Sequence, residues 1–441
     1  MQNDKRTLKD LSFTGNESGG NILHMIDRCT TFAGRSVLQQ LLHHAPAGYE
    51  ALCRQQEAVR FWALRPELWP AEVTNGTLVM LEKFYESADS YSSHPGGFGL
   101  VGSKLFQKLF NRSEYFFTQF SLTHLSDLLH TCTRLTGLLE DRSLPVLLQE
   151  LLLQMQKAMD HRLTAELLKV NKDTPFREQA RLSFHARREM KANVQELTLL
   201  YARLDAWHSM AKAGREHGWN FPELLPAKPV QAKITGLYHP LLLQPVRYDI
   251  EFAPGRNFMI LTGANMSGKT TLMRALGVAT ILAHMGMAVP AAHMQMSFME
   301  TVVTNMHVED DLLKGESFFL AEVRSIRHTA TAVAGAIPHL VLMDELFKGT
   351  NVHDAYECTK AIVEGLLLHP DHIMILSTHL HEVARHFEHQ PGLNFYCFST
   401  KLGSDGNFEF NYRLQPGISD DRIGYKILVK EGIVAILQGQ K

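Results

Sequence analysis

The sequence predicts an all-helical N-terminal half followed by an α/β domain with a largely parallel sheet. Apolar residues recur at helical spacing through the first half, whereas short β-type runs alternate with helical segments after about residue 222. The prolines Pro222, Pro226 and Pro229 mark this change. At 441 residues the chain is also too long for one compact core. We therefore expect a helical domain over residues 1–225 and an α/β domain over residues 226–441.

The helical domain is expected to carry a long arm over about residues 121–217. Its second helix is predicted by Thr174 as a cap, Pro175 at the first helical position and Glu178 in the first turn. A polar turn at 170–173 then joins two antiparallel helices, 121–170 and 175–217. The first helix is supported by leucines that share one apolar stripe, namely Leu122, Leu125, Leu129, Leu135 and Leu139.

The strongest motif is a phosphate-binding loop of the form G-x-x-x-x-G-K-[ST]. It follows the strand-like run 258–261 and precedes an apolar helix predicted over 271–282, which is the context that gives the pattern its meaning. Loop amides and the positive end of the helix dipole suit phosphate, while Lys269 reaches the β- and γ-phosphates and Thr270 binds Mg²⁺. The expected ATP-binding residues are Gly263, Ala264, Asn265, Met266, Ser267, Gly268, Lys269, Thr270 and Thr271.

Two carboxylates follow a second buried strand. The apolar run 340–343 ends in Asp344 and Glu345, at the carboxyl edge where open α/β sheets place their ligands. Asp344 is suited to hold the Mg²⁺ shell, and Glu345 to orient or deprotonate the attacking water. An apolar run followed by two acids is common by itself, so this interpretation depends on the phosphate loop.

A third strand-like run, 372–376, ends just before His379. A neutral imidazole at that edge is suited to contact the γ-phosphate or the hydrolytic water. His379 therefore joins Lys269 and Glu345 as a catalytic candidate. The alternative is a surface histidine in a chain that contains 23 of them.

The charge balance limits how the chain can hold DNA. The formal net charge is −2, so only a local cationic patch is available. The best candidate lies on the second arm helix, although a solvated helix face is the alternative. Its cations are Arg177, Arg181, Arg187, Arg188 and Lys191.

Cysteine usage and hydropathy indicate the compartment. The five cysteines form no C-x-x-C pair, and the N-terminus has no apolar signal region. We therefore expect a cytoplasmic protein. The apolar segment 275–292 is interrupted by His284, Gly286 and Pro290, which favours a buried helix over a membrane span.

Together these motifs resemble those of the MutS family of DNA mismatch-repair ATPases, within the wider ABC class of ATPases. The loop TGANMSGKTTLMR is similar to TGPNMxGKSTxxR, including an Asn-Met pair that generic phosphate loops lack. Residues 315–322 resemble G-x-S-x-F-x-x-E, residues 340–355 resemble LVLxDExGRGTSTxDG, and residues 377–382 resemble A-T-H-x-x-E. Residues 7–42 also resemble the start of the family's helical core.

The resemblance implies a helical core and lever domain followed by an ABC-type P-loop ATPase domain. It implies ATP and Mg²⁺ as cofactors, DNA as a partner, and a homodimer whose two ATPase domains pair head to tail. In that dimer the signature serine, Ser317 in this sequence, approaches the γ-phosphate bound by the other subunit.

The chain also departs from the family pattern. It begins where the helical core begins, so we expect it to lack the mismatch-reading and connector domains. Its arm turns over at 171–174, where the family inserts a DNA-gripping clamp, and Lys348 replaces the usual arginine. Tyr248 is the candidate for stacking on adenine, because Pro245 or Val246 stands where an aromatic residue is expected.

The expected function is thus a MutS-like, Mg²⁺-dependent ATPase that couples ATP binding and hydrolysis to DNA binding. Repair or recombination is the expected setting, without a mismatch-reading domain in the same chain. The alternative is a nucleotide-gated scaffold that binds protein partners, with little or no DNA binding.

Overall fold

The computed structural model describes residues 3–15, 20–87, 112–306, 318–402, 408–419 and 433–437. Contacts divide the chain into two compact units. The sheet unit comprises Met1–Met25, Leu42–Cys53 and His217–Lys441, and the helical unit comprises Ile26–Leu41 and Arg54–Glu216. The described strands all lie in the sheet unit, in agreement with the predicted class of helices followed by an α/β fold.

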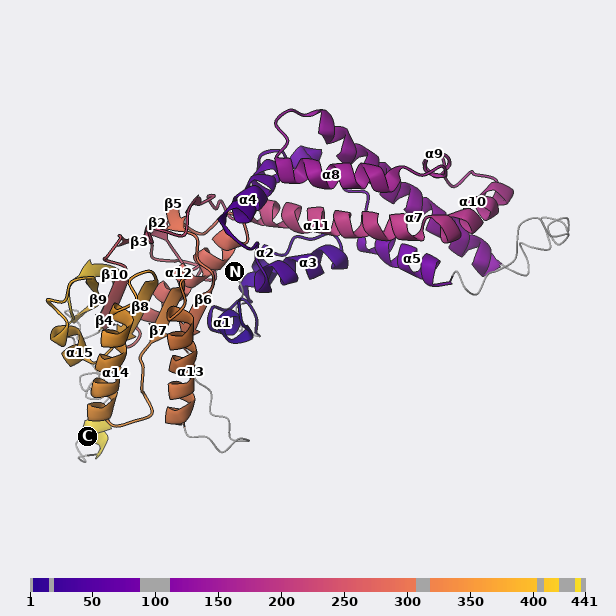
Figure 1. Ribbon diagram of the computed structural model, residues 1–441. Helices are drawn as coiled ribbons and strands as arrows, with labels where there is room; N and C mark the ends of the chain where they lie inside the picture. Colours follow the sequence, from indigo (N-terminus) through magenta and orange to yellow (C-terminus); the bar gives the residue numbers. More distant parts are fainter. Residues whose placement is uncertain are drawn as a thin grey trace. The chain divides into compact units, whose positions relative to one another are not determined.

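Within the described residues the helical unit is built from helices and contains no strand (Figure 1). Helix α7 packs against α5, α8 and α10, and α8 also packs against α11. Helices α3 (Phe32–His43) and α4 (Tyr49–Leu64) belong partly to each unit. The remaining bounds are η1 (Pro66–Leu68), α5 (Asn75–Glu86), α7 (Arg112–Thr136), η4 (Gly137–Glu140), α8 (Val146–Met159), α9 (Thr164–Leu167), α10 (Phe176–Glu189) and α11 (Lys191–Glu216).

The arm predicted as two long helices is divided further. Residues 121–170 form α7, η4, α8 and α9, and α8 begins directly after Pro145. Proline lacks the N–H that a continuing helix needs, so it starts a helix and does not extend one. Residues 175–217 form α10 and α11, which separate at the fully buried Met190 with φ −109° and ψ 3°. Neither glycine nor proline stands near Met190, so packing decides this break.

The start of α10 also differs from the prediction. Pro175 occupies the N-cap, and Thr174 Oγ1 accepts a hydrogen bond of 2.9 Å from Asn171 N inside the preceding turn. Thr174 therefore closes the turn and does not cap the helix.

One buried carboxylate ties α11 to the start of α3. Asp205 accepts hydrogen bonds from the backbone N–H and the hydroxyl of both Thr30 and Thr31, at 2.7–3.0 Å. A Cβ on Gly34 would lie 2.3 Å from Asp205 Oδ2, so this position requires glycine. Burial raises the pKa of Asp205, and the four donors oppose that shift. Thr30, Thr31 and Gly34 of the N-terminal motif (residues 7–42) thus surround the Asp205 carboxylate, and we call these three residues its socket.

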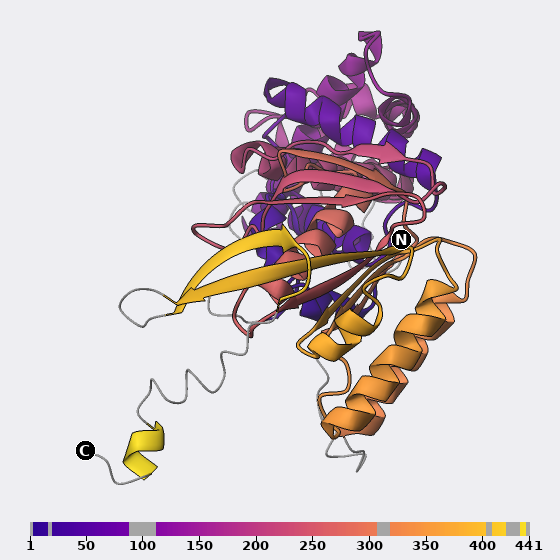
Figure 2. The same cartoon turned by 90° about the vertical axis from the view of Figure 1, so that its left-hand side faces the viewer.

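The described strands of the sheet unit form two sheets (Figure 2). The larger has the order β10-β9-β4-β8-β7-β6, in which only the pairing of β10 with β9 is antiparallel. The smaller has the order β1-β5-β2-β3. The bounds are β1 (Glu223–Leu225), β2 (Ala232–Leu237), β3 (Tyr248–Phe252), β4 (Phe258–Gly263), β5 (His293–Ser297), β6 (Val302–Asn305), β7 (Leu340–Asp344), β8 (Ile373–Thr378), β9 (Leu393–Leu402) and β10 (Phe408–Pro416). The predicted largely parallel sheet is confirmed.

Helix α12 (Lys269–His284) contacts β2 of the smaller sheet and β4, β6, β7 and β8 of the larger one. The prediction of a buried helix is thus confirmed for residues 275–284 of the apolar segment, whereas residues 285–292 lie beyond the end of the helix. No helix in the part of the chain that the structure describes is long and apolar enough to cross a membrane.

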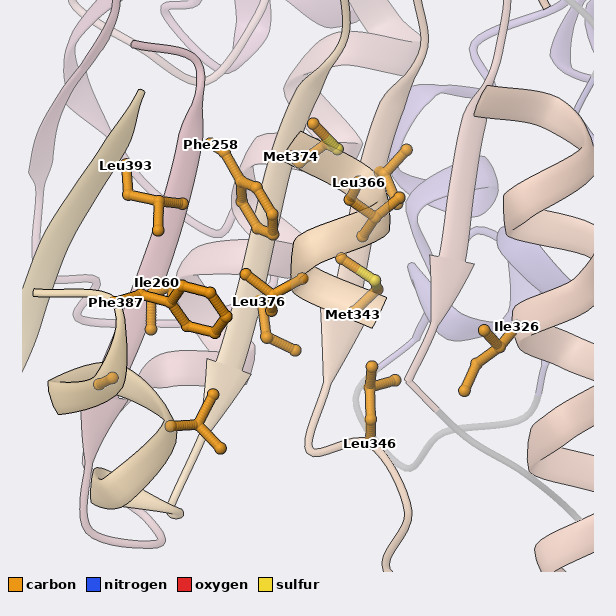
Figure 3. Packing of buried hydrophobic residues seen from close by; sticks show 14 of the residues in the cluster. Phe258, Ile260, Ile326, Met343, Leu346, Leu366, Met374, Leu376, Phe387 and Leu393 are labelled. Atoms are coloured by element: carbon orange, nitrogen blue, oxygen red, sulfur yellow. The ribbon is translucent and has the colours of Figure 1, made fainter. Parts of the chain in front are cut away.

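The opposite face of the larger sheet is covered by α13 (Phe318–Val333), α14 (Val352–Leu367) and α15 (His381–His386). Strand side chains alternate, so Val341 and Met343 pack with these helices while Leu342 approaches α12. Figure 3 shows Phe258, Ile260, Met374 and Leu376 in this cluster. These central strands are buried on both faces, so their carboxyl ends are held in one row.

The N-terminal residues belong to the sheet unit. Helix α1 (Lys5–Asp10) packs against β6, and Thr304 Oγ1 donates a 2.7 Å hydrogen bond to the buried Asp10. The short helices α2 (Ile22–Ile26) and α17 (Ile433–Leu437) complete the described elements.

Candidate nucleotide-binding site

The phosphate loop joins β4 to α12 through a tight backbone path. Gly263 and Gly268 have φ of 143° and 111°, values that L side chains rarely adopt. A Cβ on Gly263 would also lie 2.9 Å from Phe398 O of β9. Met266 at the tip has φ 67° and is 81% exposed. The sequence therefore folds into a loop that the sheet edge and the first turn of α12 hold from both sides.

Lys269, the first residue of α12, is held inside this loop. Its Nζ donates hydrogen bonds of 2.8 Å to Gly263 O and 3.0 Å to Ala264 O, and it lies 3.6 Å from Glu345 Oε1. Burial lowers the pKa of Lys269, while the charges of Glu345 and Asp344 oppose that shift. The loop carbonyls thus hold the ammonium at the base of the loop.

The structure brings the two expected Mg²⁺ ligands together. Thr270 Oγ1 donates a 2.7 Å hydrogen bond to Asp344 Oδ2, across from α12 to the last residue of β7. Ser377 of β8 donates a 2.6 Å hydrogen bond to the other oxygen, Asp344 Oδ1. Sequence reasoning missed Ser377, because only the register of β7 with β8 places it opposite Asp344.

Glu345 lies among three basic side chains. Its carboxylate is 13% exposed and lies 3.6 Å from Lys269 Nζ, 3.3 Å from Lys348 Nζ and 3.8 Å from His379 Nδ1. Its backbone has φ 54°, and its N–H donates to Ser377 O at 2.9 Å. His379 is half-exposed, so it faces the side from which a substrate would arrive. All three catalytic candidates therefore meet at this edge.

The residues present fit a magnesium nucleotide. Thr270 and Asp344 offer the hard oxygen ligands that Mg²⁺ prefers. Ser267 Oγ is buried, and within the described residues it has no hydrogen-bond partner, so the loop holds a polar group ready for a ligand. Asn265 is exposed, and Thr271 lies half-buried in the first turn of α12.

Comparison with known proteins agrees with this geometry. Residues 259–436 match the family model of MutS domain V. The chain is 26% identical to the DNA mismatch repair protein MutS of Oceanobacillus iheyensis over 242 residues, which are 53% of this chain and 27% of that protein. Residues 259–436 are therefore similar to domain V of the MutS family.

Other relatives agree. The MutS protein of Shouchella clausii is 30% identical over 55% of this chain, and the DNA mismatch repair protein MSH7 of Arabidopsis thaliana is 31% identical over 46% of it. The matches cover only 28% and 20% of those two proteins, so the chain spans about a quarter of the relatives' length.

The MutS-like signature is described only from its fourth residue. Ser317 lies outside the described residues, and α13 begins at Phe318. The last signature residue, Glu322, is buried and accepts hydrogen bonds from Lys348 N at 3.1 Å and Gly349 N at 3.3 Å. The signature helix is thereby attached to the loop that follows Glu345.

Two tyrosines border the phosphate loop of this MutS-like domain. A Cβ on Gly268 would lie 3.5 Å from the ring of Tyr412 and 3.6 Å from the hydroxyl of Tyr248. Tyr248 is 4% exposed and its ring packs edge-on against Phe398, whereas Tyr412 of β10 is 41% exposed. Tyr412 therefore offers the more exposed ring, and it stacks on Phe410 with the ring centres 6.1 Å apart. The sequence motifs did not reveal it, because β10 follows them by about 30 residues.

The cations predicted as a DNA patch are partly engaged within the helical unit. Arg181 forms an ion pair with Glu166, and the Arg187 guanidinium lies 4.5 Å from the centre of the Phe84 ring. The Arg188 guanidinium lies 4.2 Å from the centre of the Phe184 ring, so Arg177 and Lys191 are the exposed cations of this set without such a contact among the described residues.

Proposed function

We propose that this chain is a Mg²⁺-dependent ATP hydrolase that couples ATP binding and hydrolysis to DNA binding. One observation carries the enzymatic part. Lys269, Thr270, Asp344, Glu345 and His379 come from three segments of the sequence and converge at one edge of the parallel sheet. That edge is where open α/β folds bind their ligands.

The phosphate loop and Lys269 bind the phosphates. When ATP enters, Lys269 Nζ exchanges its bonds to Gly263 O and Ala264 O for phosphate oxygens, while the loop amides and the N-terminus of α12 supply further donors. The ammonium is already desolvated, so its charge acts strongly on the charge that develops during transfer.

Thr270 and Asp344 would hold the metal, and bound Mg²⁺ would neutralise charge on the β- and γ-phosphates. Glu345 is placed to orient the attacking water and to accept its proton. Its carboxylate forms ion pairs with Lys269 and Lys348. His379 is placed to contact the γ-phosphate or the same water.

Steady-state hydrolysis by Lys269→Ala and Glu345→Gln tests this proposal. We expect Lys269→Ala to weaken ATP binding, and Glu345→Gln to retain binding while hydrolysis falls about 100-fold or more. Glu364→Gln, on the exposed face of α14, is the matched control and should hydrolyse at the wild-type rate. Equal rates in wild type and Glu345→Gln would contradict the enzymatic role.

We also propose a head-to-tail homodimer in which Ser317 completes the partner's site. The support is the resemblance of residues 315–322 to the family signature, together with the contact of Glu322 with the loop beyond Glu345. Mixing inactive Lys269→Ala with inactive Ser317→Ala should restore about a quarter of the activity, because half of the randomly assorted dimers would hold one intact site. Failure of the mixture to recover activity would contradict the composite site.

A nucleotide-gated protein scaffold with little or no DNA binding is the second candidate function. The ion pair of Arg181 and the ring contact of Arg187 favour the scaffold, because these cations are already engaged. Fluorescence anisotropy with homoduplex, mismatched and branched DNA, titrated with salt and repeated with ATP, separates the two. A steep loss of binding with salt indicates phosphate contacts. If DNA binding at low salt does not respond to ATP, the result would favour the protein scaffold.

A further inference from the structure

Ser377 is a buried hydroxyl that contacts both acidic residues of the site. The parallel register pairs it with Asp344, and its side chain is fully buried. Its Oγ donates a 2.6 Å hydrogen bond to Asp344 Oδ1, and its carbonyl accepts 2.9 Å from Glu345 N. The chemical steps above leave this hydroxyl without a role.

The two oxygens of Asp344 have different partners. Oδ2 accepts from Thr270 Oγ1, whereas Oδ1 accepts from Ser377 Oγ. A serine hydroxyl has one proton to donate, and a hydrogen bond to a carboxylate is short and strong. The bond therefore fixes the rotation of the carboxylate group, with Oδ2 toward Thr270 and the N-terminus of α12.

We propose that Ser377 is a positioning residue that sets the Mg²⁺ affinity of the site by orienting Asp344. The inference rests on the proposed Mg²⁺-ATPase function. Removing an outer-shell partner of a metal ligand typically costs ~10–100-fold in metal affinity.

The test is a Mg²⁺ titration of nucleotide binding, followed with a fluorescent ATP analogue, on the full chain. Ser377→Ala should raise the half-saturating Mg²⁺ concentration about tenfold, while binding without Mg²⁺ and the melting temperature stay near wild type. At saturating Mg²⁺ the kcat should recover. Ser377→Cys, a weaker donor of similar shape, should give an intermediate shift.

Thr280→Val is the control, because it removes a buried hydroxyl on α12 whose 2.8 Å bond goes to Leu276 O of the same helix. It should leave the Mg²⁺ titration unchanged. An unchanged titration in Ser377→Ala would overturn the positioning role, as would an equal loss of nucleotide binding with and without Mg²⁺. Failure of the wild-type chain to bind the analogue at any Mg²⁺ concentration would instead overturn the ATPase proposal and this inference with it.

Discussion

Thr270 Oγ1 donates a 2.7 Å hydrogen bond to Asp344 Oδ2, so two residues 74 positions apart in the sequence share one proton at the sheet edge. Thr270 is fixed by the first turn of α12, and Asp344 by the end of β7. The distance between these two oxygens is therefore set by the packing of α12 against the sheet. A change in that packing would therefore change the distance between Thr270 Oγ1 and Asp344 Oδ2.

The Thr270 hydroxyl is predicted to be essential for metal-dependent hydrolysis. Thr270→Val keeps the shape of the side chain but removes the oxygen, so we expect hydrolysis to fall about 100-fold at limiting Mg²⁺. Thr270→Ser keeps the oxygen and should remain within about threefold of wild type. Rates measured over a Mg²⁺ series check this, and wild-type rates for Thr270→Val would exclude Thr270 as a ligand.

Tyr412 is predicted to contact the base or sugar of the nucleotide. Its ring is 41% exposed beside Gly268, so Tyr412→Ala should raise KM for ATP about tenfold with little change in kcat, because it removes a stacking surface and no reacting group. Tyr412→Phe should bind like wild type. If Tyr248→Phe weakened binding while Tyr412→Ala did not, the assignment would move to Tyr248.

His284 is predicted to make the sheet unit sensitive to acid. Its Nδ1–H donates to Thr280 O and its Nε2 accepts from Met299 N, both at 2.8 Å, so the neutral ring is fully bonded. Burial lowers the pKa of His284 from 6.5 to about 4. Between those values the unfolded chain binds a proton that the native one does not, so stability falls as pH drops from 6.5 to 4, by about 3 kcal/mol.

Denaturant titrations across that pH range measure this loss. His284→Gln, which can still donate and accept, should flatten the pH dependence by the contribution of one proton. An identical pH profile in wild type and His284→Gln would show that another group carries the loss.

Asp205 and Gly34 are predicted to be the most sensitive pair in the helical unit. Asp205→Ala leaves four donors of Thr30 and Thr31 without their acceptor, which should cost about 3 kcal/mol or more. Gly34→Ala should cost a comparable amount, because the new Cβ would lie 2.3 Å from Asp205 Oδ2. Thermal unfolding measures both losses. Gly137→Ala is the control, since a Cβ there meets nothing within 4 Å.

The double variant sharpens the same prediction. When Asp205 is replaced by alanine, the clash with a Cβ at position 34 disappears. Gly34→Ala should therefore destabilise the Asp205→Ala variant much less than it destabilises the wild type. Additive losses would show that the two residues do not form one socket.

Much of the nucleotide site followed from local patterns. Lys269 and Thr270 are placed by a loop whose glycines and following helix are read directly from neighbouring residues, and β4, β7 and β8 have the length and apolar character of buried strands. The two breaks in the arm differ in how far local sequence explains them. The first coincides with Pro145, a residue that cannot continue a helix, whereas the break at Met190 has no local signal and depends on what surrounds that side chain.

By itself, then, the sequence determined the phosphate loop, the acidic strand end and the order of helices and strands, because each depends on residues within one or two turns of each other. The tertiary structure alone decided the partners of those groups. Ser377 meets Asp344 through the register of two strands, Tyr412 meets the loop through a later antiparallel strand, and Asp205 meets Thr30 across about 175 residues. Such contacts depend on how buried faces pack against one another, and that packing leaves no periodic trace in the sequence.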